Sequence, residues 1–210
     1  MGYSHINRAA LTARHLEGAL LYANRYDLMK SMRIERGCVI AEVGVAIGDF
    51  SVFLIEELKP SKFVAVDLFN MEERPIHWGV PQEVLLKGLK HFEFYRRRMA
   101  PYGDLVSLER GFSHDCLGRF QDKSFDMIYV DAAHDYENAL RDGELALKKI
   151  KDNGIIVFND YVMYDPFIDS EYGVVQAVNE LILREAWSVI GFAFETNMFC
   201  DIAIRRSPLR

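Results

Sequence analysis

Residues 39–51, VIAEVGVAIGDFS, constrain the fold of this chain more strongly than any other segment. An apolar run typical of a buried strand ends in Glu42 and leads directly into a turn that carries Gly44 and Gly48. The first glycine permits a tight turn and the close approach of a ligand, and the second lets the next helix pack closely on the strand. The segment therefore predicts a strand, a ligand-binding turn and a helix in succession.

Short apolar runs and helical stretches alternate along most of the remaining chain. The expected strands are 39–43, 63–66, 105–109, 125–130 and 155–158, and the expected helices are 50–58, 81–99, 113–120 and 136–150. Alternation of this kind predicts a parallel sheet with helices on both faces.

The two ends of the chain depart from this alternation. Apolar residues recur at helical spacing near the amino terminus, so 1–36 is expected to be a helical region. Past Asp160, a helix over 173–183 precedes two β-rich runs, 188–194 and 198–205, joined by about four residues. We therefore predict a doubly wound, mostly parallel α/β sheet of seven strands that ends in a carboxy-terminal antiparallel hairpin.

Length and composition favour a single domain. A chain of 210 residues that is 50% hydrophobic can bury one core well and is short for two. We expect one domain over 1–210, with the α/β core over 37–210. The irregular stretch 69–80 leaves the sheet where a parallel strand ends, and it is therefore a candidate lid.

Charge and cysteine content exclude several classes of partner. The net charge is −6 with a pI near 5.5, which disfavours a nucleic-acid substrate. The three cysteines include no C-x-x-C pair, so neither a zinc site nor a redox motif is expected. No apolar run approaches the length of a membrane span, and the amino terminus has no basic region followed by an apolar core. We expect a cytoplasmic protein that binds neither nucleic acid nor membrane.

The acid in the first strand selects among nucleotide cofactors. Glu42 would repel the pyrophosphate of a dinucleotide, whereas it suits the ammonium group of an amino-acid-bearing nucleoside. The dinucleotide fingerprint G-x-G-x-x-G also fits poorly, because Ala46 takes the middle position and Gly48 falls one residue early. Asp67 ends the next expected strand, where a carboxylate can accept hydrogen bonds from both ribose hydroxyls.

This combination resembles the first motif of class I S-adenosylmethionine-dependent methyltransferases, and the expected sheet resembles their Rossmann-like fold. Ser113 stands where that family contacts the adenine, although it could equally be a helix N-cap. The resemblance implies a cofactor site made of Glu42, Gly44, Gly48, Asp67, Leu68, Ser113 and Asp131.

Two later stretches, FDMIYVDAAHDYENALRD and GIIVFNDY, carry the most specific downstream signal. Two expected strands end at Asp131 and Asp160, with Asn159 beside the latter, so these oxygens could converge in one crevice. Hard divalent cations such as Mg²⁺ prefer oxygen ligands. His134 lies three residues after Asp131, and its imidazole suits removal of a proton from a hydroxyl near neutral pH.

These stretches resemble the branch of class I methyltransferases that includes the macrocin- and mycinamicin-type sugar O-methyltransferases. The resemblance implies that Asp131, Asn159 and Asp160 bind Mg²⁺ and that His134 is the general base. Asn159 departs from the branch, in which an acid is usual, because an amide offers a ligand oxygen without charge. The expected acceptor is a small molecule with a vicinal diol, such as a sugar or a polyhydroxylated natural product.

Several alternatives stay open. Transfer of the methyl group to nitrogen or carbon without metal is compatible with Asn159. The chain could also be a non-catalytic cofactor-binding module, or an NAD-dependent oxidoreductase. The amphipathic amino-terminal helix could form a homodimer surface, or it could cover the cofactor.

Overall fold

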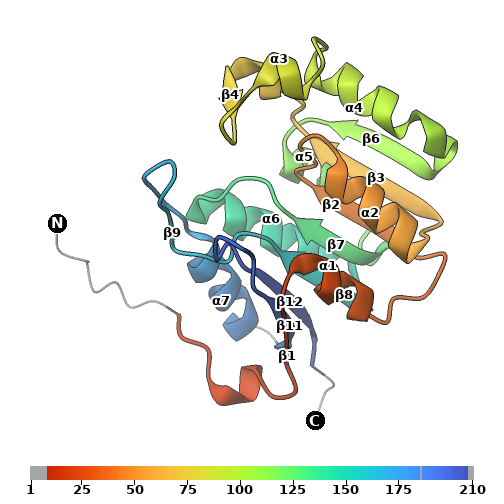
Figure 1. The fold of residues 1–210 in the computed structure, drawn as a ribbon. Coiled ribbons are helices and arrows are strands. Elements are labelled where there is room, and N and C mark those ends of the chain that lie inside the picture. Colours follow the sequence, from red (N-terminus) through yellow and green to blue (C-terminus); the bar gives the residue numbers. More distant parts are fainter. Residues whose placement is uncertain (1–8, 185, 208–210) are drawn as a thin grey trace.

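An eight-stranded sheet forms the centre of the fold (Figure 1) in the computed structural model, which describes residues 9–184 and 186–207. The strands follow the order β1-β11-β12-β8-β7-β2-β3-β6. Their bounds are β1 Leu20–Tyr22, β2 Val39–Val43, β3 Lys62–Asp67, β6 Val106–Arg110, β7 Phe125–Val130, β8 Ile150–Phe158, β11 Trp187–Ala193 and β12 Asp201–Arg206.

The pairing directions confirm the expected doubly wound arrangement. Strands β8, β7, β2, β3 and β6 pair in parallel, and β12 lies antiparallel between β11 and β8. The predicted total of seven strands misses β1, which pairs in parallel with the free edge of β11. Leu20 and Leu21 of β1 are 59% and 69% exposed, so the apolar spacing that predicted a helix there does not mark a buried face.

The amino-terminal region is therefore only partly helical. A short 3₁₀ helix η1, Ala13–His15, precedes β1, and the helix α1 follows over Arg25–Ser31. The side chain of Asn24 caps α1 by accepting a hydrogen bond from the amide of Asp27. Residues 1–8, which the sequence also assigned to this helical region, lie outside the described residues.

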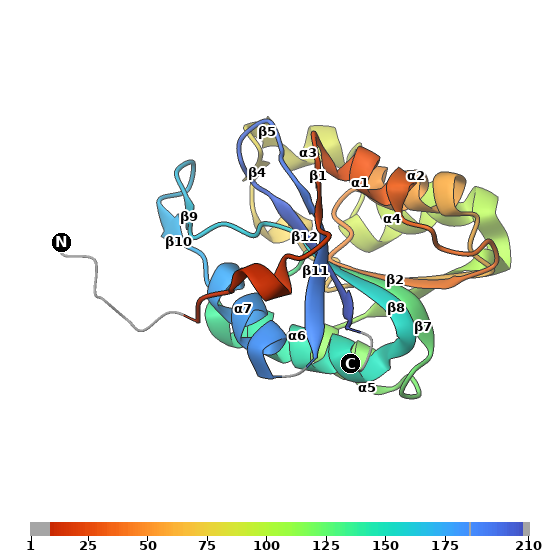
Figure 2. The same cartoon turned by 90° about the horizontal axis from the view of Figure 1, so that it is seen from below.

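Two helical layers cover the sheet (Figure 2). Alternate residues of β7 face opposite layers: Met127 and Tyr129 pack toward α1, α2 and α4, whereas Ile128 and Val130 pack toward α5, α6 and α7. The bounds of these helices are α2 Asp49–Leu58, α4 His91–Met99, α5 Ser113–Gly118, α6 Tyr136–Lys149 and α7 Val174–Arg184. None of the helices in the described part of the chain is long and apolar enough to cross a membrane.

The expected helix over 81–99 is two helices, because Lys87 and Gly88 adopt positive φ angles between them. The first of the two is α3, Gln82–Leu85. Strand β8 begins at Ile150, earlier than expected, and the connection between β11 and β12 spans 194–200, longer than the expected four residues. A 3₁₀ helix η3, Ala100–Leu105, leads into β6.

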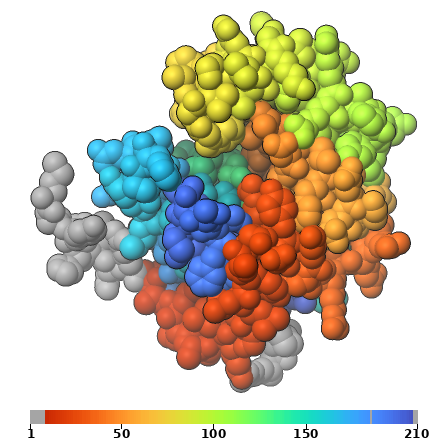
Figure 3. Space-filling model, in the orientation of Figure 1, coloured from red at the N-terminus to blue at the C-terminus, as the bar shows by residue number. Residues whose placement is uncertain are grey.

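Two small hairpins leave the sheet at its carboxyl edge. The candidate lid, 69–80, is not irregular: it holds the 3₁₀ helix η2, Met71–Glu73, and the strands β4, Ile76–His77, and β5, Val80–Pro81. The second hairpin, which follows Asp160, pairs β9, Tyr164–Asp165, with β10, Ser170–Glu171. Figure 3 shows the two segments, yellow and cyan, on either side of a recess.

Candidate functional site

The order of the strands reverses between β2 and β7. The chain continues from β2 to β3 and β6 on one side, and from β7 to β8 on the other. Adjacent crossovers therefore leave in opposite directions and open a crevice at the carboxyl ends of β2 and β7, where α/β sheets bind their ligands.

Gly44 lies at the bottom of this crevice. Its amide donates to the carbonyl of Val66 at 2.8 Å, while the amide of Asp131 donates to the carbonyl of Val43 at 2.7 Å. Gly44 has a φ of +83°, and a Cβ there would lie 1.7 Å from the carbonyl oxygen of Asp131. The turn can thus approach the end of β7 only because residue 44 has no side chain.

Gly48 allows the close approach of a different element, the helix α4. It is the N-cap of α2 with a φ of +82°, and a Cβ would lie 2.8 Å from Cε2 of Tyr95. The sequence predicted that this glycine allows the helix to pack against its strand. In the structure, the three atoms nearest to a Cβ at this position all belong to Tyr95 and Met99 of α4, so the glycine makes room for that helix.

Asp67, at the end of β3, connects the two turns beside the crevice. Its Oδ2 accepts a hydrogen bond from the amide of Val45 at 2.8 Å, and its Oδ1 accepts one from the amide of Phe69 at 2.6 Å. Each carboxylate oxygen retains a further lone pair, so the group can still accept hydrogen bonds from a ligand. Leu68, beside it, is exposed.

Glu42 lies beneath the turn and is only 2% exposed. The hydroxyl of Ser51 donates to its Oε2 at 2.5 Å, and the hydroxyl of Tyr95 donates to Ser51 at 2.8 Å. Burial raises the pKa of Glu42 to about 8, and the charge of Asp131 acts in the same direction. Contact between this carboxyl group and a cofactor ammonium stays a prediction.

The buried position of Glu42 predicts a pH-dependent stability. Its pKa rises from 4.5 to about 8 on folding, so stability is fully present below pH 4.5 and is lost as the pH rises toward 8. We expect Glu42→Gln, which keeps the acceptor for Ser51, to be more stable than wild type by a few kcal/mol at pH 8 and much less so at pH 5.

Denaturant unfolding at the two pH values measures this difference. Glu57→Gln is the control, because Glu57 is exposed on the same helix that carries Ser51. A gain for Glu42→Gln at pH 8 that does not exceed the gain for Glu57→Gln would show that Glu42 ionises freely in the folded protein.

Asp131, His134 and Asp160 come together at the carboxyl ends of β7 and β8. The Nε2 atom of His134 lies 3.2 Å from Oδ2 of Asp160 and 3.6 Å from Oδ1 of Asp131. One ligand atom from each residue falls within 4.8 Å of the others. The Nε2 atom is buried without a well-aligned hydrogen-bond partner among the described residues. The cluster is therefore suited to hold a proton or a cation between its two carboxylates.

Burial and mutual charge shift the proton affinities in this cluster. Burial, together with the charge of Asp131, raises the pKa of Asp160 to about 6. Burial alone would lower the pKa of His134, but its interactions with Asp131 and Asp160 outweigh that effect and raise it. Asp160 also adopts a φ of +52°, a strained conformation for a residue other than glycine.

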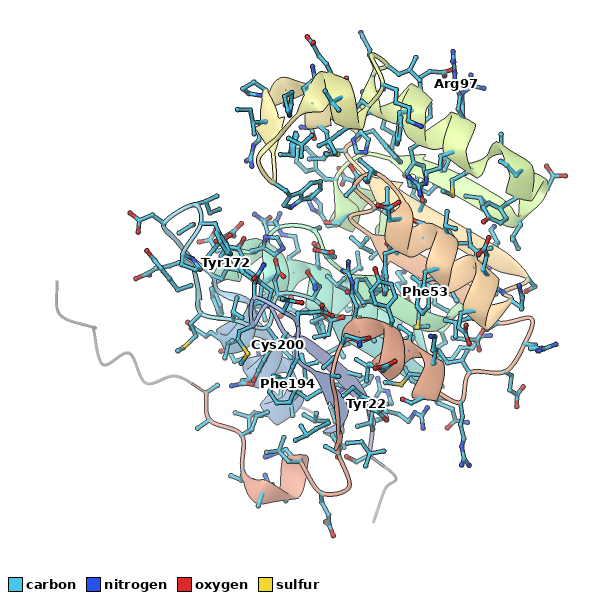
Figure 4. The ribbon with its side chains drawn as sticks, in the orientation of Figure 1. Tyr22, Phe53, Arg97, Tyr172, Phe194 and Cys200 are labelled. Carbon is cyan, nitrogen blue, oxygen red and sulfur yellow. The ribbon has the colours of Figure 1, made fainter. Side chains whose placement is uncertain are left out.

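The loop before α7 holds the imidazole of His134 in place. The ring of Tyr172, which Figure 4 labels, stacks on it with centroids 4.6 Å apart and an angle of 12° between the planes. The Tyr172 hydroxyl donates to Oδ2 of Asp165 at 3.0 Å, and the amide of Gly173 donates to the carbonyl of His134 at 2.7 Å. The loop thus fixes both the backbone and the ring plane of His134.

The amide nitrogen of Asn159 makes its hydrogen bond outside this cluster. Its Nδ2 donates to Oδ1 of the fully buried Asp201 at 2.7 Å, so the side-chain amide is oriented by the first residue of β12. The hydroxyl of Tyr129 donates to the other oxygen of Asp201 at 2.7 Å. Burial raises the pKa of Asp201 to about 7. A ligand role for the Asn159 oxygen stays a prediction.

Sequence reasoning missed the roles of Asp201 and Tyr129. The available signals were weak: a single hydroxyl within the apolar run of β7, and an acid at the start of a β-rich run. Neither residue belongs to a recognisable motif, and they meet only because β12 inserts next to β8.

Ser113 lies on α5, which packs against β3, the strand that ends at Asp67. It is the first residue of the helix and not its N-cap, which is Phe112. Its hydroxyl donates to Oδ1 of Asp142 on α6 at 2.5 Å, so the side chain joins two helices. A cofactor contact from Ser113 stays a prediction.

Comparisons with known proteins address the whole of this region. A family model described as a methyltransferase domain matches residues 41–161, which include the glycine turn and the cluster of Asp131, His134 and Asp160. No curated protein gives a significant sequence match.

Several solved structures share the fold. The O-methyltransferase TomG from Streptomyces achromogenes, involved in tomaymycin synthesis and solved with S-adenosylmethionine, is 20% identical, with 95% of this chain and 82% of that chain covered and a TM-score of 0.61. An O-methyltransferase from Bacillus cereus, solved with S-adenosylhomocysteine, is 18% identical, with 95% and 83% covered and a TM-score of 0.62.

The pyocyanin biosynthetic protein PhzM is 13% identical over 87% of this chain, with a TM-score of 0.57. The present chain spans about half of PhzM, 54% of its length. At such identities, these likenesses show a shared fold.

Proposed function

Since this chain belongs to the methyltransferase domain family matched over residues 41–161, we propose that it transfers a methyl group from S-adenosylmethionine to a hydroxyl of a small molecule. The observation that carries this proposal is the position of His134, held between Asp131 and Asp160 at the mouth of the crevice. The two O-methyltransferases that share the fold, solved with S-adenosylmethionine and S-adenosylhomocysteine, support both the donor and an oxygen acceptor.

The crevice offers a place for each part of the cofactor. Asp67 would accept hydrogen bonds from the ribose, and its two backbone partners already hold the carboxylate in position. Leu68 follows β3 and Ser113 follows β6, so both stand on the side of β2 proposed for the adenine. Because Gly44 has no side chain, the turn packs against the end of β7, and the remainder of the cofactor would cross that end next to Asp131.

His134 is proposed as the general base. Its imidazole takes the proton of the acceptor hydroxyl as the oxygen forms its bond to the methyl carbon and the carbon–sulfur bond breaks. Asp131 and Asp160 stabilise the imidazolium that results, and Tyr172 keeps the ring plane fixed. The protein otherwise acts by aligning two bound molecules, which can supply effective molarities of about 10⁵ M or more.

The same residues fit a divalent cation such as Mg²⁺. Carboxylates from Asp131 and Asp160 converge within 4.8 Å of the His134 nitrogen, and that nitrogen is buried without an aligned partner among the described residues. Asp131 and Asp160 would hold the ion, with the Asn159 oxygen as a neutral third ligand. When bound, the ion would anchor neighbouring acceptor oxygens and lower the pKa of the hydroxyl.

One observation favours a second candidate, methyl transfer without metal. The side chain of Asn159 is a neutral amide that adds no charge toward a cation, and its nitrogen is already engaged with Asp201. His134 itself lies close enough to both carboxylates to take the place of an ion between them.

The entrance to the crevice suits an acceptor that is partly apolar. Trp78 in the turn of the β4–β5 hairpin and Phe167 in the turn of the β9–β10 hairpin are each 71% exposed. These hairpins border the recess in Figure 3. Large exposed aromatic side chains at a recess can stack on the apolar face of a sugar or a polyhydroxylated natural product.

Formation of S-adenosylhomocysteine in the presence of candidate acceptors tests the proposal. We expect turnover with vicinal diols to exceed turnover with the matching monohydroxyl compounds, to fall on chelation, and to return with Mg²⁺. Turnover that is indifferent to chelation would select the metal-independent candidate. Transfer to amines only would overturn the oxygen acceptor, and failure to bind S-adenosylmethionine would overturn the donor.

A further inference from the structure

Arg25 reaches the same crevice from the amino-terminal region. It is the first residue of α1 and follows the end of β1 by three positions, at the carboxyl edge of the sheet. Its guanidinium carbon lies 4.4 Å from the ring centroid of Phe50, which follows the glycine turn on α2. Its Nη1 lies 3.4 Å from the hydroxyl of Tyr129 on β7. The guanidinium therefore lies between the two elements that form the crevice.

Contacts of Arg25 and of the next residue, Tyr26, hold this part of α1 in place. Its amide donates to Oε1 of Glu195, in the loop between β11 and β12, at 2.6 Å. The next residue, Tyr26, packs edge-on against Phe53 of α2 with centroids 4.8 Å apart; Figure 4 labels Phe53. Helix α1 thus covers the start of α2 and brings Arg25 to a fixed position.

The charge of this guanidinium has no direct partner in the part of the chain that the structure describes. Among the described residues, its side chain donates one long hydrogen bond, to a neutral hydroxyl, and forms no ion pair within 4.0 Å. Acidic groups nevertheless lie near it. Its positive charge acts to lower the pKa of Glu42, Asp160 and Asp201, against the larger effect of their burial. A guanidinium carries five donors in a planar fork that matches a carboxylate, and most of these donors are uncommitted here.

The arrangement of charges selects the type of anion. A simple anion beside Arg25 would also lie near the carboxylate of Asp131, which would repel it. An α-amino acid group avoids this conflict, since its carboxylate can meet the arginine while its ammonium meets Asp131. Of the parts of S-adenosylmethionine, the methionyl group has this pair of charges.

Position along the sheet agrees with this choice. Asp67, the proposed ribose ligand, ends β3 on one side of β2, and Tyr129 belongs to β7 on the other side. A ligand that starts at Asp67 and crosses the end of β2 therefore finishes beside Tyr129 and Arg25. We propose that Arg25 binds the α-carboxylate of the cofactor's methionyl group, and this inference rests on the proposed use of S-adenosylmethionine.

Calorimetric binding of two ligands without acceptor tests the assignment. S-adenosylmethionine and its decarboxylated form differ only in the carboxylate, and both keep the sulfonium and the amine. We expect wild type to prefer the carboxylated ligand. Arg25→Met, which keeps an unbranched apolar stem over Phe50, is expected to weaken that ligand's binding about 10- to 100-fold and to leave the decarboxylated ligand within about 2-fold.

Two further variants complete the experiment. Arg25→Lys is expected to recover part of the preference, because it restores the charge without the fork. Arg33→Met, at an exposed arginine just past α1, is expected to change neither affinity. Equal weakening of both ligands in Arg25→Met, or an unchanged preference, would overturn the assignment and leave the proposed function intact. Absence of binding of either ligand to wild type would instead overturn the proposed donor, and the assignment with it.

Discussion

His134→Ala is expected to lower kcat for methyl transfer by about 10²- to 10⁴-fold while the affinity for S-adenosylmethionine stays within about 2-fold of wild type. The imidazole is the group between Asp131 and Asp160 that can accept a proton from a hydroxyl, and its removal leaves two carboxylates without their partner. Single-turnover methyl transfer, measured alongside calorimetric binding, separates the chemical step from cofactor capture.

His114→Ala provides the matched control for this experiment. His114 also lies near a carboxylate, 3.8 Å from Asp115, but it belongs to α5 and stays outside the cluster. We expect its replacement to change kcat by less than about 3-fold. A His134 variant with near-normal kcat would remove the general base from the mechanism, and loss of cofactor binding in step with kcat would indicate a structural role for the side chain.

The sequence predicts the centre of this fold well, because its parallel strands are buried on both faces and appear as continuous apolar runs. The expected strands 39–43 and 125–130 coincide with β2 and β7. Strand β1 has no such pattern: it has three residues, and its pairing partner, β11, lies about 170 residues away. Its conformation depends on that distant edge, so local spacing indicated a helix instead.

The candidate site also contains residues whose proximity the sequence predicts and residues whose proximity it does not. Asp131, His134 and Asp160 follow strand ends, and parallel strands bring their carboxyl ends to one edge, so their proximity could be predicted. Arg25 meets Tyr129 across 104 positions of sequence, and Tyr129 meets Asp201 across 72. Such pairs depend on the insertion of β12 and the placement of α1, which no local pattern specifies.

The orientation of the Asn159 side chain also depends on a contact that is distant in the sequence. The sequence places it beside Asp160 at the end of β8, where an amide oxygen could serve as a ligand. The direction of its amide nitrogen is set by Asp201, which the antiparallel register of β12 brings alongside. The motif therefore predicts which residues approach the crevice, and the adjoining strand decides which atom of Asn159 is available.

Gly44→Ala is expected to lower the free energy of unfolding by about 3–5 kcal/mol and to abolish measurable cofactor binding. The positive φ alone costs an alanine about 1–2 kcal/mol. The added methyl would also lie 1.7 Å from the carbonyl oxygen of Asp131, so the ends of β2 and β7 would have to separate. That movement strains the hydrogen bonds made by the Gly44 and Asp131 amides, each worth about 1 kcal/mol.

Gly37→Ala isolates the backbone contribution, because Gly37 has the same φ of +83° but a methyl group added to it would meet no atom within 4 Å among the described residues. We expect the free energy of unfolding of this control to fall only by the cost of the positive φ, and we expect the control to bind the cofactor normally. Urea unfolding and calorimetry on both variants therefore measure how much the contact between the turn and β7 contributes. Equal losses in the two variants would mean that the end of β7 moves aside freely, and that the close approach of Gly44 to Asp131 does not define the crevice.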